Sequence, residues 1–323
     1  MTVLPRQRIT PALFIALAFF LPISSLAQET SDDVLTQSLP LRTALHHDPT
    51  LAAPLDRLLD LFRKENRVDE LVGMYRAHTA QYPLDMNGRT VLVRLLAATG
   101  DPEALTAARQ AVTQFPQNGY LHFLLYQRLR ADNDPQALDA LDKAIELEPL
   151  AARKVAWIDL LVPAALLDGR RDLAKQHLEG LSKLADTPER RVEVARKMNE
   201  HEFHDLALAL LTNSDGPRPA PETGVDLELE AARAEIGLKR NDAAAKRLDA
   251  LLAKLTADYW RRPEIVRRRL ALVISQEERA RMIAAARRRV EDNPGDEAAA
   301  LDLAQMLMAF QYRRDALDAL LAA

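Results

Sequence analysis

The chain has 323 residues and a formal net charge of −4, with 48% hydrophobic, 28% charged and only 5% aromatic residues. This length exceeds what one hydrophobic core needs, and the balance of apolar and charged residues excludes collagen-like, mucin-like and wholly disordered proteins. Alanine-rich segments with helical spacing of apolar residues recur, and no long stretch alternates β-branched with polar residues, so an all-α fold is predicted.

Residues 1–27 have the three parts of a secretory signal peptide. Arg6 and Arg8 supply the basic start, residues 11–23 the apolar stretch, and residues 25–27 (Ser-Leu-Ala) a small-x-small cleavage site. Because the apolar stretch is shorter than the roughly 20 residues of a spanning helix, we expect cleavage and no transmembrane segment afterwards. The predicted location is the periplasm; secretion, or anchoring by an uncleaved signal, is the alternative.

Residues 28–48 are predicted to form an N-terminal linker and one capping helix, because four leucines between Leu35 and Leu45 suffice to cover the exposed face of a first hairpin. A repeat follows. The segment Asp-Pro-Glu-Ala-Leu at Asp101 recurs as Asp-Pro-Gln-Ala-Leu at Asp134, and Pro116 recurs at the same offset as Pro149. Asp is a good helix N-cap and Pro suits the first helical position, so a helix is expected to start at each copy.

This unit of helix, turn, helix and proline exit resembles the tetratricopeptide repeat (TPR), whose second helix carries a small residue where its two helices touch. In our register that position is occupied by Leu71, Ala104, Ala137, Ala174, Ala207, Ala244, Met282 and Ala316. The resemblance covers residues 50–323. It implies a right-handed superhelical α-solenoid of about seven to eight TPR-like hairpins.

The only proline-dense loop after the leader divides the predicted solenoid. We expect a first array of repeats over 49–214, a Pro-rich loop over 215–221 and a second array over 222–323. The last hairpin stops partway through its second helix without the polar outer face of a terminal repeat. The chain is therefore expected to be a piece of a longer one, or to dock on something at that end.

In the TPR family the first helices line a concave groove that takes extended peptides or partner helices. The resemblance places eleven candidate groove residues in the three clearest hairpins. They are Asp56, Asp60, Arg63 and Lys64, then Asn87, Thr90 and Arg94, then Tyr120, Phe123, Gln127 and Arg130. The Lys and Asn of the family's carboxylate clamp are absent, and simple solvation is the alternative for each residue.

Residues 261–289 hold the sharpest charge feature, with ten arginines against three acids. Arginine forks match carboxylates and phosphates, so this face could hold an acidic partner, anionic lipid or acidic polysaccharide. The candidate anion-binding residues are Arg261, Arg262, Arg267, Arg268, Arg269, Arg287, Arg288 and Arg289. Nucleic acid is not expected, because export would place the chain in the wrong compartment. A solvated helix face is the alternative.

No reaction chemistry is predicted. The chain has no cysteine, which excludes disulfides and thiol nucleophiles, and it has no HExxH, GxSxG or Walker motif. The histidine groups His46-His47 and His201/His204 lack a third ligand at a supporting distance. We therefore expect no catalytic residues, no metal and no cofactor.

The function expected from the sequence is that of a non-enzymatic scaffold or adaptor in the bacterial cell envelope, with a protein or peptide as its partner. The alternative is the helical N-terminal region of a larger secreted enzyme or polysaccharide-export assembly, whose active or pore domain lies beyond Ala323.

Overall fold

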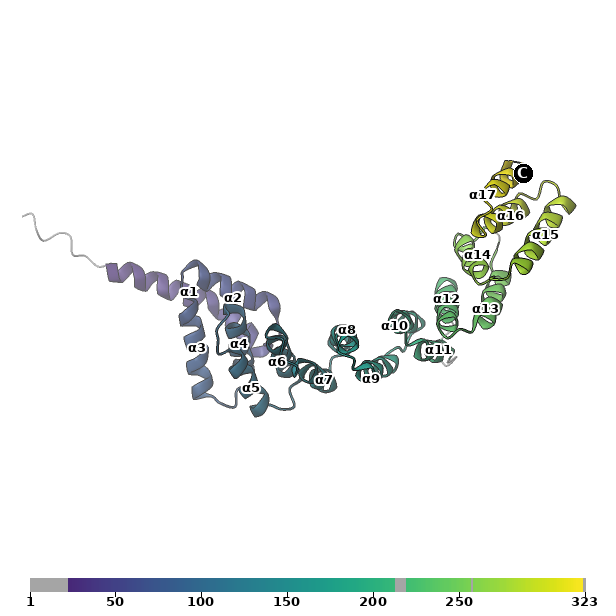
Figure 1. Ribbon diagram of the computed structural model, residues 1–323. Coiled ribbons are helices and arrows are strands. Elements are labelled where there is room, and N and C mark those ends of the chain that lie inside the picture. The colour runs from purple at the N-terminus through teal and green to yellow at the C-terminus, as the bar shows by residue number, and fades with distance from the viewer. Residues whose placement is uncertain (1–22, 213–218, 257, 322–323) are drawn as a thin grey trace, which may run out of the picture. The chain divides into compact units, whose positions relative to one another are not determined.

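The computed structural model describes residues 23–212, 219–256 and 258–321. Within these ranges the chain forms seventeen α-helices and no strand (Figure 1). The all-α prediction is confirmed. The helices belong to two compact units, Met1–Glu148 and Pro149–Ala323, which are described separately.

The first unit consists of a leading helix and three helix pairs. Its helices are α1 (Ile23–His47), α2 (Ala52–Lys64), α3 (Val68–Gln81), α4 (Met86–Thr99), α5 (Ala104–Gln114), α6 (Gly119–Ala131) and α7 (Ala137–Leu147). The pairs are α2–α3, α4–α5 and α6–α7, and α4 also contacts the first helix of the next pair, α6. The leading helix packs on α2 and α4, with Val34 and Leu45 in their shared core.

The second unit continues with five helix pairs. Its helices are α8 (Ala151–Leu167), α9 (Arg171–Ser182), α10 (Pro188–Glu200), α11 (His204–Thr212), α12 (Pro221–Gly237), α13 (Asn241–Lys254), α14 (Arg262–Ala271), α15 (Gln276–Asp292), α16 (Glu297–Ala309) and α17 (Arg313–Leu321). Two of the first helices contact the first helix of the next pair: α10 contacts α12, and α14 contacts α16. The α-solenoid of eight helical hairpins is thereby confirmed.

Seven of the eight described turns within a hairpin contain one residue in the left-handed conformation. These residues are Asn66, Gly100, Asn133, Gly169, Glu202, Lys239 and Gln311. In each turn the following N–H donates to the carbonyl five residues back, as from Asp101 to Leu96 at 2.9 Å and from Asp134 to Leu129 at 2.8 Å. This is the Schellman helix end, which satisfies carbonyls that the helix leaves unpaired and reverses the chain.

The small-residue positions predicted from the repeat lie in the hairpin interiors. Ala104, Ala174, Ala207, Ala244 and Ala316 are all completely buried. A larger side chain at such a position would push the two helices apart, which explains the preference for alanine. Of the other three predicted positions, Leu71 and Ala137 are buried and Met282 is half-buried.

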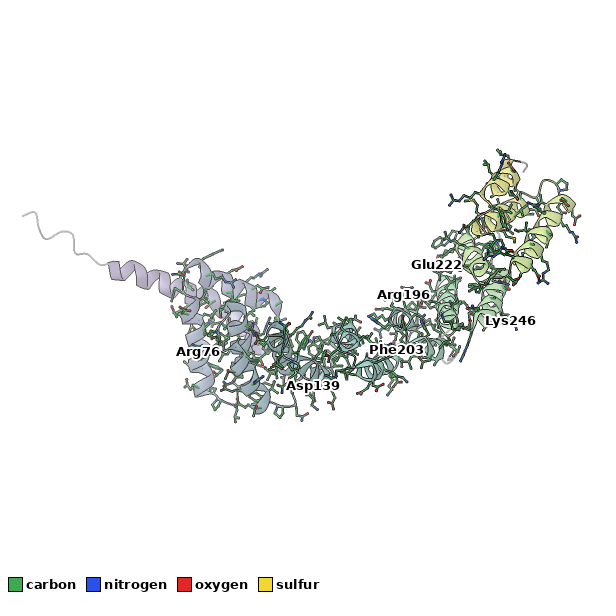
Figure 2. The ribbon with its side chains drawn as sticks, in the orientation of Figure 1. Arg76, Asp139, Arg196, Phe203, Glu222 and Lys246 are labelled. Carbon is green, nitrogen blue, oxygen red and sulfur yellow. The ribbon has the colours of Figure 1, made fainter. Side chains whose placement is uncertain are left out.

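Neighbouring hairpins of the first unit are also joined by a repeated ion pair. Arg76 on α3 (labelled in Figure 2) donates to Asp101 at 2.9 Å, and Arg109 on α5 donates to Asp134 at 3.3 Å. Asp101 and Asp134 also accept the backbone N–H two residues on, and the α-helices begin at Ala104 and Ala137. These aspartates thus serve both the turn and the contact with the previous hairpin.

The described residues cover only some of the segment boundaries expected from the sequence. The leading helix starts at Ile23, earlier than the predicted capping segment 28–48, whereas residues 1–22 of the expected leader lie outside the described residues. Most of the Pro-rich loop 215–221 also lies outside them. The compact units divide after Glu148. The boundary at 215–221 stays a prediction.

Candidate functional site

The candidate groove residues on α2 are on its exposed side. Asp56, Asp60, Arg63 and Lys64 are all exposed. Arg63 lies 3.5 Å from both the Asp60 carboxylate and the Ala98 carbonyl, which is at the outer limit of a hydrogen bond. These side chains are available to a partner, but nothing in the structure brings them together as a site.

Two of the three candidates on α4 hold the end of α1 and the backbone that links it to α2. Asn87 Nδ2 donates to the His46 carbonyl at 2.7 Å, and Arg94 Nη1 donates to the Pro49 and Leu51 carbonyls, the latter at 2.8 Å. Thr90 is buried, and its hydroxyl donates to the carbonyl of Met86. Asn87 and Arg94 therefore anchor the end of the leading helix and the linker after it, whereas Thr90 is bonded within α4.

The candidates on α6 are brought together into an aromatic strip, defined as Tyr120, Phe123 and Tyr126. Ring centroids are 6.3 Å apart between the first two and 5.8 Å apart between the last two. Both distances fall in the range of stabilising aromatic pairs. Arg130 donates to Tyr126 Oη at 2.9 Å, and its guanidinium lies 6.0 Å from that ring's centroid.

Exposure varies along the aromatic strip. Tyr120 and Phe123 are half-buried, Tyr126 is buried, and Gln127 and Arg130 are exposed. The sequence analysis missed Tyr126, although its three-residue spacing from Phe123 places it one helical turn along the same side of α6. The strip therefore combines partly accessible apolar area with an exposed positive charge.

The arginine segment 261–289 is partly neutralised by three acids that lie outside it in sequence. Arg261 donates to Asp226 at 2.8 Å, Arg269 to Asp249 at 2.9 Å and Arg287 to Asp315 at 2.8 Å. Although burial alone would lower the pKa of Arg261, its hydrogen bonds to Asp226 and Glu264 raise that pKa above its usual value.

Local partners engage two more of these arginines. Arg268 pairs with Glu264 at 2.7 Å, and Arg262 donates to the Leu252 carbonyl at 3.0 Å. The remaining candidates are exposed and have no ion pair within the described part of the chain: Arg267, Arg288 and Arg289. These three are the exposed arginines among the eight candidates whose charge no acid of the described residues offsets, and anion binding by all eight stays a prediction.

The two histidine groups of the sequence have different surroundings. His204 Nδ1 lies 3.0 Å from Asn199 Oδ1, between α10 and α11, whereas His46 lies near Asp85 and His78. Among the described residues no group of three or more His, Asp or Glu side chains is placed to hold a metal ion. No helix in the same ranges is both long and apolar enough to cross a bilayer.

Comparisons with known proteins add distant structural matches. No family model matches the chain, and no curated protein does. A chain of the crystal structure of the APC/C hetero-tetramer Cut9–Hcn1 is 15% identical, with a TM-score of 0.32, over 89% of this chain and 52% of that one. A chain of the Naa15/Naa10 structure bound to HypK-THB is 17% identical, with a TM-score of 0.31, over 83% and 46%.

A third match is the P58(IPK) TPR domain, 12% identical, with a TM-score of 0.26, over 83% of this chain and 91% of that one. The chain spans about half the length of the first two matched chains. The TPR-like fold of this chain is therefore inferred from the chain itself, which has consecutive helix pairs, buried small residues and a repeated left-handed turn.

Proposed function

We propose that the chain is a non-enzymatic scaffold of the bacterial cell envelope that binds a peptide or partner protein on the first helices of its hairpins. The observation that carries this proposal is the aromatic strip of α6 beside the exposed Arg130. Aromatic and arginine side chains are the residue types that contribute most to binding at protein interfaces. A stacked helical array offers a surface built from many hairpins, which suits recognition.

The surface favours an extended peptide with an aliphatic or aromatic side chain next to an acidic one. The apolar side chain would pack on Tyr120 and Phe123, which are only half-buried in the free chain. The acidic side chain would pair with Arg130, whose guanidinium is already oriented by its hydrogen bond to Tyr126. This orientation reduces the entropy lost when the peptide binds.

Peptides selected by the mature chain from a random display library provide the probe. We expect Phe123→Ala to weaken their binding about tenfold or more in fluorescence polarisation, and Arg130→Glu to weaken the acidic peptides most. Arg57→Glu on α2 is the matched control, since Arg57 is exposed and has no partner among the described residues. Selected peptides that bind all of these variants with equal affinity would refute the proposal.

Export to the periplasm is proposed from the pattern of residues 1–27. Expression of the full chain, osmotic-shock fractionation and mass spectrometry of the product test it directly. The expected product lies in the periplasmic fraction and begins near Gln28. Recovery of the intact chain from the cytoplasm would contradict it.

A further inference from the structure

Helices α1, α3 and α4 of the first unit line a partly open cavity of about 320 Å³, here called the α1–α4 cavity. This volume lies at the lower end of the range of about 300–1,000 Å³ that small-molecule sites occupy. Arg42, Thr43 and His46 line it from α1, and Tyr75 and His78 line it from α3. Its walls therefore carry several hydrogen-bond donors on separate helices.

The cavity arises where the first unit departs from its own repeat. Three residues that line the cavity correspond to small or apolar residues one repeat further along the chain. The corresponding pairs are Tyr75 and Ala108, His78 and Ala111, and Gly88 and Leu121. One repeat further along the chain, Ala108 and Ala111 on α5 and Leu121 on α6 are buried together in an apolar cluster. The equivalent place between α3 and α4 has polar groups and open space instead.

Gly88 is required for this arrangement. A Cβ at this position would lie 2.6 Å from Asp85 Oδ2 and 2.8 Å from His78 Cδ2. His78 Nε2 and Asp85 Oδ2 are themselves 2.6 Å apart. Any side chain larger than that of glycine would therefore separate the His78–Asp85 pair and fill part of the cavity.

The carboxylate beside the cavity is already satisfied by the protein. Asp85 caps α4 by accepting the N–H groups of Asn87 and Gly88 at 3.0 and 3.1 Å, and it pairs with His78. Burial would raise the pKa of Asp85, but these hydrogen bonds and the nearby His46 hold it below its ordinary value. No acidic side chain of the described residues lines the cavity itself.

Two donors on residues that line the cavity lack a protein partner among the described residues. Arg42 uses Nε and Nη2 for the Ser38 hydroxyl and the Leu35 carbonyl, at 3.1 and 3.2 Å, which leaves Nη1 unengaged among the described residues. The Tyr75 hydroxyl likewise has no hydrogen bond to any described residue. Burial raises the pKa of Tyr75 to about 12, so its hydroxyl remains a donor at neutral pH.

We propose that the α1–α4 cavity binds a small organic carboxylate, with its charged end at Arg42 and Tyr75 and its hydrocarbon part against Met74 and Val91. The guanidinium supplies the charge-assisted hydrogen bond, the phenol adds a neutral one, and the two apolar side chains select a ligand with a tail. This site is separate from the aromatic strip of α6, so each proposal can fail without the other.

Ligand-observed NMR titrations of the mature chain with benzoate and hexanoate test the proposal, with benzamide and inorganic phosphate as comparison probes. We expect both carboxylates to bind with a Kd of the order of 1 mM or tighter. Benzamide lacks the charge and phosphate lacks the tail, so both are expected to bind about tenfold more weakly or worse.

Two variants locate the site. Tyr75→Phe removes only the hydroxyl and is expected to weaken benzoate about fivefold, whereas Arg42→Met is expected to weaken it about tenfold or more. The matched controls, Tyr312→Phe and Arg57→Met, alter exposed side chains outside the cavity and should leave the Kd unchanged. Circular dichroism checks that each variant is folded.

Three results would overturn the assignment. The first is the absence of saturable binding of either carboxylate to the wild-type chain. The second is full retention of benzoate affinity by folded Tyr75→Phe and Arg42→Met. The third is binding of phosphate or benzamide as tight as that of benzoate, because the site would then not recognise the combination of charge and apolar tail.

Discussion

The left-handed hairpin turns make the effect of a Gly→Ala substitution depend on position. Gly73 lies within α3, and Gly100 has φ 71° in the α4–α5 turn. A Cβ built at either position meets nothing within 4 Å. The same methyl group is thus added twice without a clash, so any difference between Gly73→Ala and Gly100→Ala reports backbone conformation alone.

The two changes should have opposite signs. Inside a helix Ala is favoured over Gly by about 1 kcal/mol, so Gly73→Ala should stabilise the first unit by about that amount. At positive φ the Cβ costs roughly 1–2 kcal/mol, of which about 0.4–1 kcal/mol is returned because Ala has fewer unfolded conformations. Gly100→Ala should therefore destabilise the unit, and the two variants should differ by roughly 2 kcal/mol, about thirtyfold in the unfolding equilibrium.

Hydrogen exchange of the α3–α5 amides is the appropriate assay, because it reports the opening of this unit separately from the rest of the chain. Gly180→Ala in α9 and Gly169→Ala, at φ 73° in the α8–α9 turn, repeat the comparison in the second unit. If both members of either pair shift protection in the same direction, the conformational reasoning is wrong.

Three further predictions follow from single contacts. Arg94→Met should destabilise the first unit by about 1.5–3 kcal/mol in urea titrations, because the Pro49–Leu51 carbonyls lose a charged donor, whereas the exposed control Arg57→Met should change stability by less than about 0.5 kcal/mol. In the folded chain the pKa of Asp85 lies below its unfolded value of 3.8, so ionised Asp85 stabilises the fold fully above pH 3.8, and this stabilisation is lost as the pH falls through the lowered pKa. Asp85→Asn removes this titration and should therefore reduce the acid-induced fall in the Tm of this unit. Arg247→Met should cost the second unit about 3 kcal/mol in urea titrations, because it leaves the 8% exposed side chain of Glu235 without its partner at 2.8 Å; an unchanged midpoint would contradict this.

The hairpins could be predicted from the sequence because their signals are local. Ala104 and Ala137 sit at the same place in successive repeats, and both are buried where two helices touch. The left-handed turns were less visible, because Gly100 is the expected residue at such a position but Glu202 and Lys239 are not. Their conformation is imposed by the packing of the two helices that they join.

The binding surfaces could be predicted only in part, because their partners are distant in sequence. Arg94 and Arg130 are both groove candidates from the sequence, yet Arg94 donates to the backbone near Pro49 whereas Arg130 lies beside an aromatic ring. The charge of the arginine segment is partly offset by Asp226, Asp249 and Asp315, which a count of charges within residues 261–289 does not include. The α1–α4 cavity likewise depends on three helices.

The repeated turn bears on how a chain of this kind can gain length. Each Schellman turn is closed by hydrogen bonds within its own hairpin, such as that from Arg67 to Phe62, so a copied hairpin brings its reversal with it. The ion pair between Arg109 and Asp134 joins neighbouring hairpins, and a copied hairpin would carry the same contact to the next copy. Tandem duplication of one such block would therefore yield a foldable insert, whose residues can afterwards diverge toward new ligands.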